Sequence, residues 1–270
     1  MPAVTVGDLA IFYRETGSGE PVLLLQGLGV DHRGWGLQVA ALSPWFRCIT
    51  PDNRDVGRSG RAAGPYTVAD MAGDAAGLLD ALGVAQAHVV GISLGGAVAQ
   101  ELALSRPERV RSLALIATYC SGDPRGTALF TGWRLMRERL SPEEYYRATY
   151  PWVFTVGDYL KPGFIEGMVE RAATDPYLQE PEAWARQMAA ATSFHSEDRL
   201  GRIAAPTLLL FGEADLLTPL RFARVMRERI PNAELVVIPE AGHGLIWSHA
   251  EVVNAALLGF LLRQRERQGG

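Results

Sequence analysis

Ser93 has the neighbours that a nucleophilic serine needs. It lies in Gly91-Ile92-Ser93-Leu94-Gly95, after an apolar run and before the helix-forming residues 97–102. A chain that turns from a strand into a helix within one residue is crowded, so the positions two before and two after the serine must lack a Cβ. The turn exposes the hydroxyl and places the backbone N–H of Leu94 at the helix start, where unpaired amides stabilise developing negative charge. We predict that Ser93 is a nucleophile and that Leu94 supplies half of an oxyanion hole.

Further along the chain lie an acid and a base that such a serine requires. A serine hydroxyl needs a base to take its proton, and the base needs a third group to orient it. Two carboxylates, Glu213 and Asp215, follow the apolar run 207–211. His243 follows a later apolar run and stands between two glycines, which let a loop carry the imidazole close to Ser93. His243 is therefore the expected base, with either carboxylate as its partner.

The other four histidines are not expected to act as the base. We expect His88, at the start of the strand that leads to Ser93, to satisfy a backbone group. His195 and His249 fall on helical or inter-helical stretches and are expected to be solvated. His32 lies in a loop after an early strand and is a minor candidate for substrate contact.

From about residue 4 to 262 the chain resembles an α/β-hydrolase, closest to the esterase and lactonase branch that includes proteins like 3-oxoadipate enol-lactonase. The resemblance rests on the elbow around Ser93 and on the order serine, acid, histidine along the chain. Gly212-x-x-Asp215 resembles the acid loop of the family, so the resemblance favours Asp215 over Glu213. It implies an α/β fold with a mostly parallel eight-stranded sheet flanked by helices and a helical cap insert.

The resemblance also implies the second half of the oxyanion hole and shows two departures. The loop after the strand near 22–25 supplies it, so the backbone N–H of Leu28 is the expected donor. Most relatives have histidine where this chain has Gln26, and we expect the glutamine to support the loop by hydrogen bonding. Asp55 stands where relatives have glycine in Asp-x-Arg-Gly-x-Gly-x-Ser. This difference weakens any inference of the chain's substrate specificity from that of its relatives.

Length and composition agree with one large α/β core. The chain has 270 residues, 48% of them hydrophobic, and a formal net charge of -4, which gives no basic surface for nucleic acid. Cys48 and Cys120 fall in or beside expected core strands, so two buried free thiols are predicted. Residues 1–8 lack a signal pattern, and no apolar run approaches the ~18 residues of a membrane span. We expect a cytoplasmic protein without membrane or nucleic-acid partners; the oligomeric state stays open.

Alternating patterns predict the elements that position the site. A hairpin is expected from 3–6 and 10–14, with Thr67 and Asp70 forming a capping box for one helix and a solvated, fraying end at 263–270. The expected parallel strands lie near 22–25, 47–50, 87–90, 113–117, 207–211 and 235–238. The expected helices lie at 36–42, 67–82, 93–105, 221–230 and 250–265.

An aromatic-rich, proline-interrupted segment separates the core, expected at 1–120 and 200–270, into two parts. We expect residues 121–199 to form a helical cap over Ser93 that shapes an apolar pocket and holds the acyl or ring portion of a substrate by burial. Most of its aromatic residues are expected to attach the cap to the core. Trp133, Trp152 and Phe154 are the pocket candidates.

These residues predict a serine hydrolase that cleaves a carboxylic ester or lactone of a small, largely apolar molecule. No metal or organic cofactor is implied, because no cluster of His, Cys and carboxylates has ligand spacing. A lactone with a free carboxylate would need a cation, for which Arg134, Arg147 and Arg186 are the candidates. Two alternatives use the same triad: carbon–carbon bond hydrolysis of a diketone, and a ligand receptor on a hydrolase scaffold.

Overall fold

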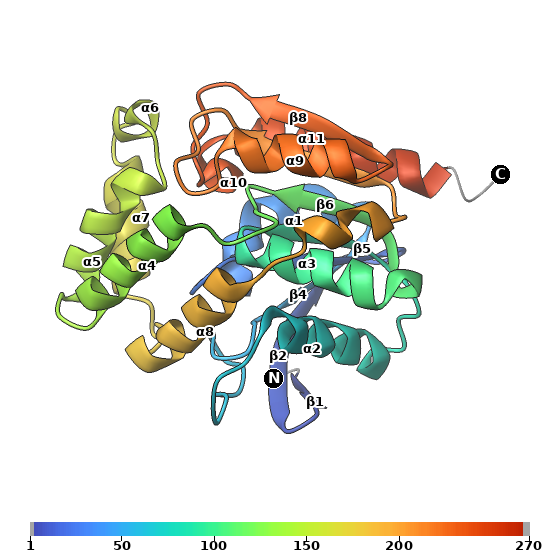
Figure 1. Cartoon of the computed structure of the whole chain (residues 1–270), viewed down its shortest axis with the longest axis horizontal. Coiled ribbons are helices and arrows are strands. Elements are labelled where there is room, and N and C mark those ends of the chain that lie inside the picture. The colour runs from blue at the N-terminus through green and yellow to red at the C-terminus, as the bar shows by residue number, and fades with distance from the viewer. Residues whose placement is uncertain (1–2, 267–270) are drawn as a thin grey trace.

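The core is a single eight-stranded sheet, seen in a computed structural model that describes residues 3–266 (Figure 1). Its strand order is β1-β2-β4-β3-β5-β6-β7-β8. The first two pairings are antiparallel and the other five are parallel. The strands are β1 Ala3–Val6, β2 Leu9–Thr16, β3 Pro21–Leu25, β4 Arg47–Pro51, β5 Ala87–Ile92, β6 Val110–Ile116, β7 Thr207–Gly212 and β8 Ala233–Ile238. The predicted mostly parallel sheet is confirmed.

Helices cover both faces of the sheet, which is why its central strands are mostly apolar and buried. Along β3, Leu23 and Leu25 pack into one core cluster and Val22 and Leu24 into the other. The first cluster includes residues of α2, α3 and α9, and the second includes residues of α1, α10 and α11. These helices are α1 Gly36–Leu42, α2 Val68–Ala81, α3 Leu94–Ser105, α9 Leu220–Arg229, α10 Leu245–Ser248 and α11 Ala250–Glu266.

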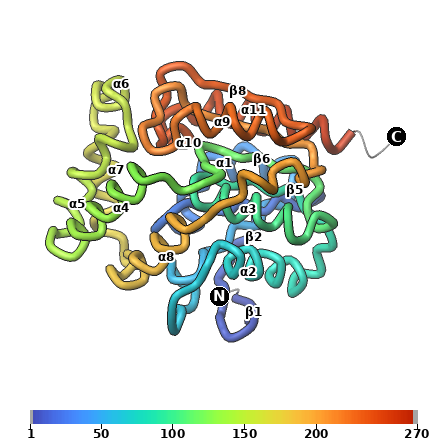
Figure 2. The backbone as a smooth tube through the Cα atoms, in the orientation of Figure 1, coloured from blue at the N-terminus to red at the C-terminus, as the bar shows by residue number. Residues whose placement is uncertain are grey.

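The chain between β6 and β7 holds five more helices, which lie to one side of the sheet in both ribbon and tube views (Figure 2). α8 runs from this group back along the core, where Ala190 and Ala191 join the first core cluster. The five are α4 Pro124–Arg137, α5 Pro142–Thr149, α6 Val156–Tyr159, α7 Phe164–Ala173 and α8 Pro181–Ser193. Short 3-10 turns occur at His32–Trp35, Pro107–Arg109, Tyr150–Trp152 and Glu197–Arg202.

Most predicted boundaries agree with these elements, and two differ for a local reason. β6 ends at Ile116 and excludes Ala117, whose φ of 41° is left-handed. α3 begins at Leu94 because Ser93, with φ 54°, is its N-cap. The Thr67 and Asp70 capping box is present, and Cys48 and Cys120 are buried and free, as predicted. Of the predicted fraying end 263–270, residues 267–270 lie outside the described part of the chain.

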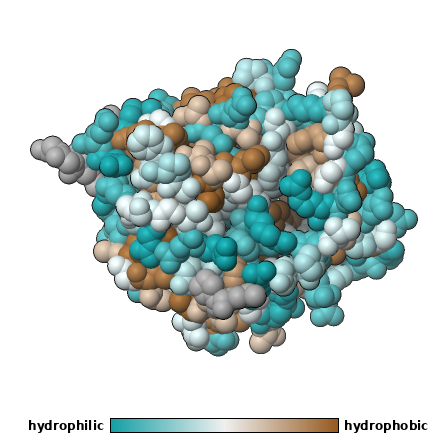
Figure 3. Space-filling model, turned by 180° about the vertical axis from the view of Figure 1, so that it is seen from behind, coloured by the Kyte–Doolittle hydropathy of each residue, from teal (hydrophilic) through white to brown (hydrophobic). Residues whose placement is uncertain are grey.

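Within residues 3–266, no helix combines the length and apolarity that crossing a bilayer requires. On the face opposite to Figure 1, hydrophobic patches are interrupted by hydrophilic residues (Figure 3).

Candidate active site

Ser93 sits on a strained turn between β5 and α3. Its backbone has φ 54° and ψ -120°, a conformation that non-glycine residues rarely adopt. Two hydrogen bonds from the neighbouring strand end hold it: the Ser93 N–H donates to Ile116 O at 3.0 Å, and Thr118 Oγ1 donates to Ser93 O at 2.6 Å. A Cβ on Gly95 would clash with the backbone of Leu25. The absence of that Cβ explains the close approach of α3 to the end of β3.

His243 and Asp215 are brought together from the loops after β8 and β7. Asp215 Oδ2 lies 2.9 Å from His243 Nδ1, and the carboxylate is almost fully buried. It also accepts hydrogen bonds from the amides of Leu217 and Thr218 at 2.8 Å and from Thr218 Oγ1 at 2.7 Å. Burial by itself raises the pKa of Asp215, but the His243 charge and these hydrogen bonds outweigh it and leave the pKa below its ordinary value. Asp215 is therefore held as a carboxylate against the imidazole.

Glu213, the other acid candidate, has a different partner. Its side chain accepts a hydrogen bond from the backbone of Glu240 at 3.3 Å and is exposed. Glu240 has a left-handed φ of 57° in the turn before His243. Glu213 thus contacts the loop that carries the imidazole, whereas Asp215 contacts the imidazole itself.

The loop after β3 also lies next to the serine. A Cβ on Gly27 would lie only 3.3 Å from Ser93 Cβ, so the loop packs directly against the serine side chain. Gln26 Oε1 accepts the Gly27 N–H at 3.0 Å, and Asn53 Nδ2 donates to Gln26 O at 2.9 Å. The glutamine therefore supports the loop through a hydrogen bond, as its sequence position suggested.

Two backbone amides next to the serine have no acceptor in the described part of the chain. Leu94 is the first residue of α3, where amides have no intrahelical partner. Within residues 3–266, no group accepts a hydrogen bond from the amide of Leu28 or of Leu94. The next amide, that of Gly29, donates to Gln187 Oε1 of α8 at 2.9 Å. Sequence reasoning missed Gln187, because nothing in the chain order links it to a loop 158 positions away.

A cavity of about 290 Å³ lies beside these groups, and residues of α4, α5, α7 and α8 line it. Ser93, His243 and Leu28 line its base. Aromatic and apolar side chains from the insertion cover it, among them Trp133, Tyr145, Tyr146, Tyr150, Met168 and Trp184.

Only one of the three predicted pocket aromatics lines this cavity. Trp133 does, and it is buried. Trp152 is 37% exposed, with Arg125 over its ring, and it lies outside the cavity. Phe154 is buried against the loop that carries His243, where a Cβ on Gly244 would clash with its ring. The expectation for Trp152 and Phe154 is therefore wrong: one side chain turns to the surface, and the other packs below His243.

All three arginines expected to serve as cationic anchors form ion pairs with carboxylates of the protein. Arg134 and Arg147 form ion pairs within their own helices, with Glu138 and Glu143. Arg186 pairs with Asp55. None of the three lines the cavity; the arginines that do are Arg33, Arg137 and Arg171.

The remaining histidines have side-chain partners. His88 is buried and bonds Ser112 Oγ at 2.7 Å and Glu20 Oε2 at 3.2 Å, so the expected backbone partner is wrong. His195 is exposed and pairs with Asp198. His249 is half-buried, 2.9 Å from Ser248 Oγ.

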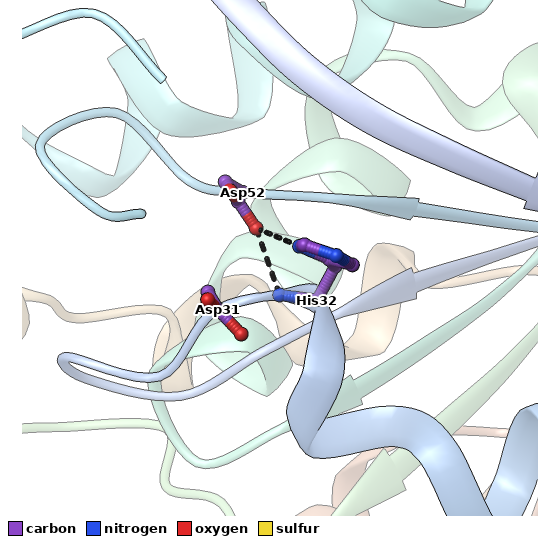
Figure 4. A group of neighbouring side chains, drawn as sticks. All are labelled: Asp31, His32 and Asp52. Atoms are coloured by element: carbon purple, nitrogen blue, oxygen red, sulfur yellow. Dashed lines mark hydrogen bonds and ion pairs between the residues drawn. The ribbon is translucent and has the colours of Figure 1, made fainter. Parts of the chain in front are cut away.

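His32 belongs to the one group of possible metal-ligand atoms found among the described residues, with Asp31 and Asp52 (Figure 4). Asp52 Oδ1 accepts hydrogen bonds from the His32 amide at 2.8 Å and contacts His32 Nδ1 at 2.7 Å. Its other oxygen accepts from the Arg58 amide, and Asp31 is bonded to the Arg33 guanidinium. These carboxylates are occupied in fastening the loop after β3.

Comparison with known proteins agrees with this fold. The family model described as the alpha/beta hydrolase fold matches residues 20–250. A putative carbamate hydrolase, RutD, of Azorhizobium caulinodans is 33% identical over 96% of this chain and 98% of its own length. A thermophilic esterase from Thermogutta terrifontis has a TM-score of 0.86 at 29% identity, covering 97% of this chain and 96% of its own. The enol-lactonase from Burkholderia xenovorans has a TM-score of 0.87 at 26% identity, covering 97% and 100%. The chain belongs to the α/β-hydrolase family.

Proposed function

We propose that this protein is a serine hydrolase that cleaves a carboxylic ester or lactone of a small, largely apolar molecule. The observation that carries the proposal is the bond between His243 and a buried Asp215, with His243 and Ser93 lining one largely aromatic cavity. A buried carboxylate on Nδ1 leaves Nε2 of the imidazole to exchange a proton with a hydroxyl.

The proposed reaction has two halves. His243 takes the proton of Ser93 as Oγ attacks the carbonyl carbon, while the amides of Leu28 and Leu94 stabilise the oxyanion. His243 then gives that proton to the leaving alcohol oxygen, the ester C–O bond breaks, and an acyl-enzyme remains. A water molecule, activated by the same imidazole, hydrolyses the acyl-enzyme and restores Ser93. Water is the only co-substrate that this sequence of steps uses.

We further propose that residues 121–199 act as a cap. Their helices supply most of the aromatic lining of the cavity, and so exclude water from the reacting carbonyl. Burial of apolar surface there supplies binding energy of roughly 25 cal/mol per Å².

Carbamate hydrolysis is a second candidate, supported by the 33% identity to the protein named putative carbamate hydrolase. A carbamate is an ester of carbamic acid, so the same attack and the same proton transfers apply.

Pre-steady-state kinetics with p-nitrophenyl acetate tests the proposal. We expect a burst of p-nitrophenol stoichiometric with protein, followed by steady turnover. A burst without turnover would indicate a receptor with a vestigial triad, and neither burst nor turnover for any ester, lactone or aryl carbamate would contradict the proposal. A matched panel of aryl acetates and N-unsubstituted aryl carbamates separates the two candidate functions.

A further inference from the structure

Ser93 stands between two cavities of unequal size. The larger, of about 290 Å³, is the one described above. The smaller, of about 50 Å³, lies under the start of α4, beside α8 and α9. Four residues line both cavities and so form the boundary: Leu28, Ser93, Phe130 and Leu217. A substrate whose carbonyl carbon is at Ser93 therefore has one space on each side.

The position of the base distinguishes the two spaces. His243 lines the larger cavity and, among the described residues, is not part of the smaller one. Leu94, whose amide faces the oxyanion, lines the smaller cavity instead. In acyl transfer the imidazole must reach the leaving oxygen to protonate it, so the leaving group lies on the side of the base.

We infer that the larger cavity takes the leaving alcohol and the smaller cavity takes the acyl group, so that the preferred substrate is an ester of a short acyl chain with a bulkier alcohol. This inference rests on the proposed function, whose acyl-enzyme would have its acyl chain in the smaller cavity. Of the expectation from sequence that the pocket under the cap holds the acyl or ring portion of a substrate, it replaces the acyl portion by the alcohol.

The size and walls of the smaller cavity define the acyl group. At 10–15 Å³ for each water-sized group, its volume accommodates roughly four such groups, about the length of a butyryl chain. Tyr119, Ala191 and Phe222 give it apolar walls, and the Tyr119 hydroxyl is turned to the backbone of Ala191 at 3.0 Å. Asp123, also in the wall, is paired with Arg221. The acyl chain is therefore short and largely apolar.

The larger cavity suits a broad, apolar alcohol. Trp133, Tyr145 and Trp184 belong to one cluster of its lining, with Tyr145 edge-on to Trp184 at 6.5 Å between ring centroids. Edge-on aromatic packing presents flat surfaces to a ring or a branched chain.

Two substrate series test the assignment. In the acyl series p-nitrophenol stays constant while acetate, butyrate, hexanoate and octanoate vary, and we expect kcat/KM to fall by about tenfold or more from butyrate to octanoate. In the alcohol series acetate stays constant while ethyl, butyl and 2-phenylethyl alcohols vary. Here we expect kcat/KM to rise, by up to about fourfold per buried CH₂.

A matched pair of variants on α4 locates the effect. Gly126 lines the smaller cavity, and an added Cβ would meet nothing closer than Asp123 Oδ2 at 3.7 Å. Gly132, on the same helix, lines neither cavity and has no neighbour within 4 Å of an added Cβ. Gly126→Leu should lower kcat/KM for butyrate about tenfold more than for acetate, and Gly132→Leu should leave that ratio unchanged.

Each outcome decides between the alternatives. Rising kcat/KM through octanoate, an unchanged butyrate to acetate ratio in Gly126→Leu, or an effect of Gly126→Leu on the alcohol series would overturn the assignment while leaving the serine hydrolase intact. If no ester in either series is hydrolysed faster than by Ser93→Ala, the assignment fails; if no lactone or aryl carbamate is hydrolysed either, the proposed function fails with it. If Gly126→Leu fails to fold, Ala191→Val, which adds volume from the α8 wall, is held to the same butyrate to acetate criterion.

Discussion

Arg186 of α8 donates two hydrogen bonds to Asp55, from Nε to Oδ2 at 2.9 Å and from Nη2 to Oδ1 at 2.8 Å. Asp55 is fully buried and has a left-handed φ of 68°, which explains why glycine suits this position in relatives. Gln179, just before α8, also donates to Asp55 O at 3.2 Å. The departure from the family pattern at Asp55 is therefore an anchor between the core and the insertion.

The first prediction concerns this anchor. Arg186→Met leaves a buried carboxylate unpaired, so we expect the free energy of unfolding to fall by about 3–5 kcal/mol. Arg134→Met, which breaks the exposed pair with Glu138, should cost less than about 1 kcal/mol. Urea unfolding measures both. Equal losses in the two variants would show that the buried pair has no special role.

The second prediction separates the two acid candidates. Asp215→Asn and His243→Ala should each lower kcat by on the order of 10³-fold or more, because the members of a triad act as a unit. Glu213→Gln should have a far smaller effect, since Glu213 bonds the backbone of Glu240 and not the imidazole. Steady-state hydrolysis of p-nitrophenyl acetate gives the comparison, and similar losses at Glu213 and Asp215 would refute the assignment of the acid.

The third prediction follows from His88. Burial is the main cause that lowers the pKa of His88 below its ordinary 6.5, and Glu20 only partly opposes it. A base with a lowered folded pKa stabilises the fold fully above its unfolded pKa, and this contribution disappears as the pH falls through the folded value. The free energy of unfolding should therefore decrease as the pH falls below about 6.5, and His88→Gln should flatten that decrease.

An exposed histidine provides the control for this pH dependence. His195→Gln removes a histidine whose side chain is exposed, and its slope of unfolding free energy between pH 7 and 5 is measured beside those of the wild type and His88→Gln. The account of His88 is wrong if His88→Gln and the wild type show the same slope over that interval.

The helices and strands of the core could be predicted from local sequence signals, and most predicted boundaries lie close to the observed ones. β5 and β7 are buried along their whole length, which is why apolar residues dominate both strands. The order of the residues along the chain was also sufficient to predict that His243 and Asp215 lie together, since the carboxyl ends of parallel strands share one edge of the sheet.

Local sequence signals could not predict the orientation of side chains in the insertion. Trp133 and Trp152 are both aromatic residues of the same segment, yet one is buried in the cavity wall and the other is 37% exposed. Which way each points depends on how five short helices pack, and no residue spacing encodes that. The bond from Arg186 to Asp55 and the role of Gln187 were missed for the same reason, because the partners Asp55 and Gly29 are 131 and 158 positions away.

Covalent labelling tests the central claim most directly. Wild-type protein incubated with a fluorophosphonate should gain one covalent adduct, located by peptide mass spectrometry on Ser93, and lose its hydrolytic activity in parallel. Ser93→Ala, with an unchanged circular dichroism spectrum, should show neither labelling nor turnover, since only a hydroxyl on this turn forms the acyl-enzyme. Labelling or ester hydrolysis that persists in folded Ser93→Ala would place the nucleophile elsewhere and contradict the account.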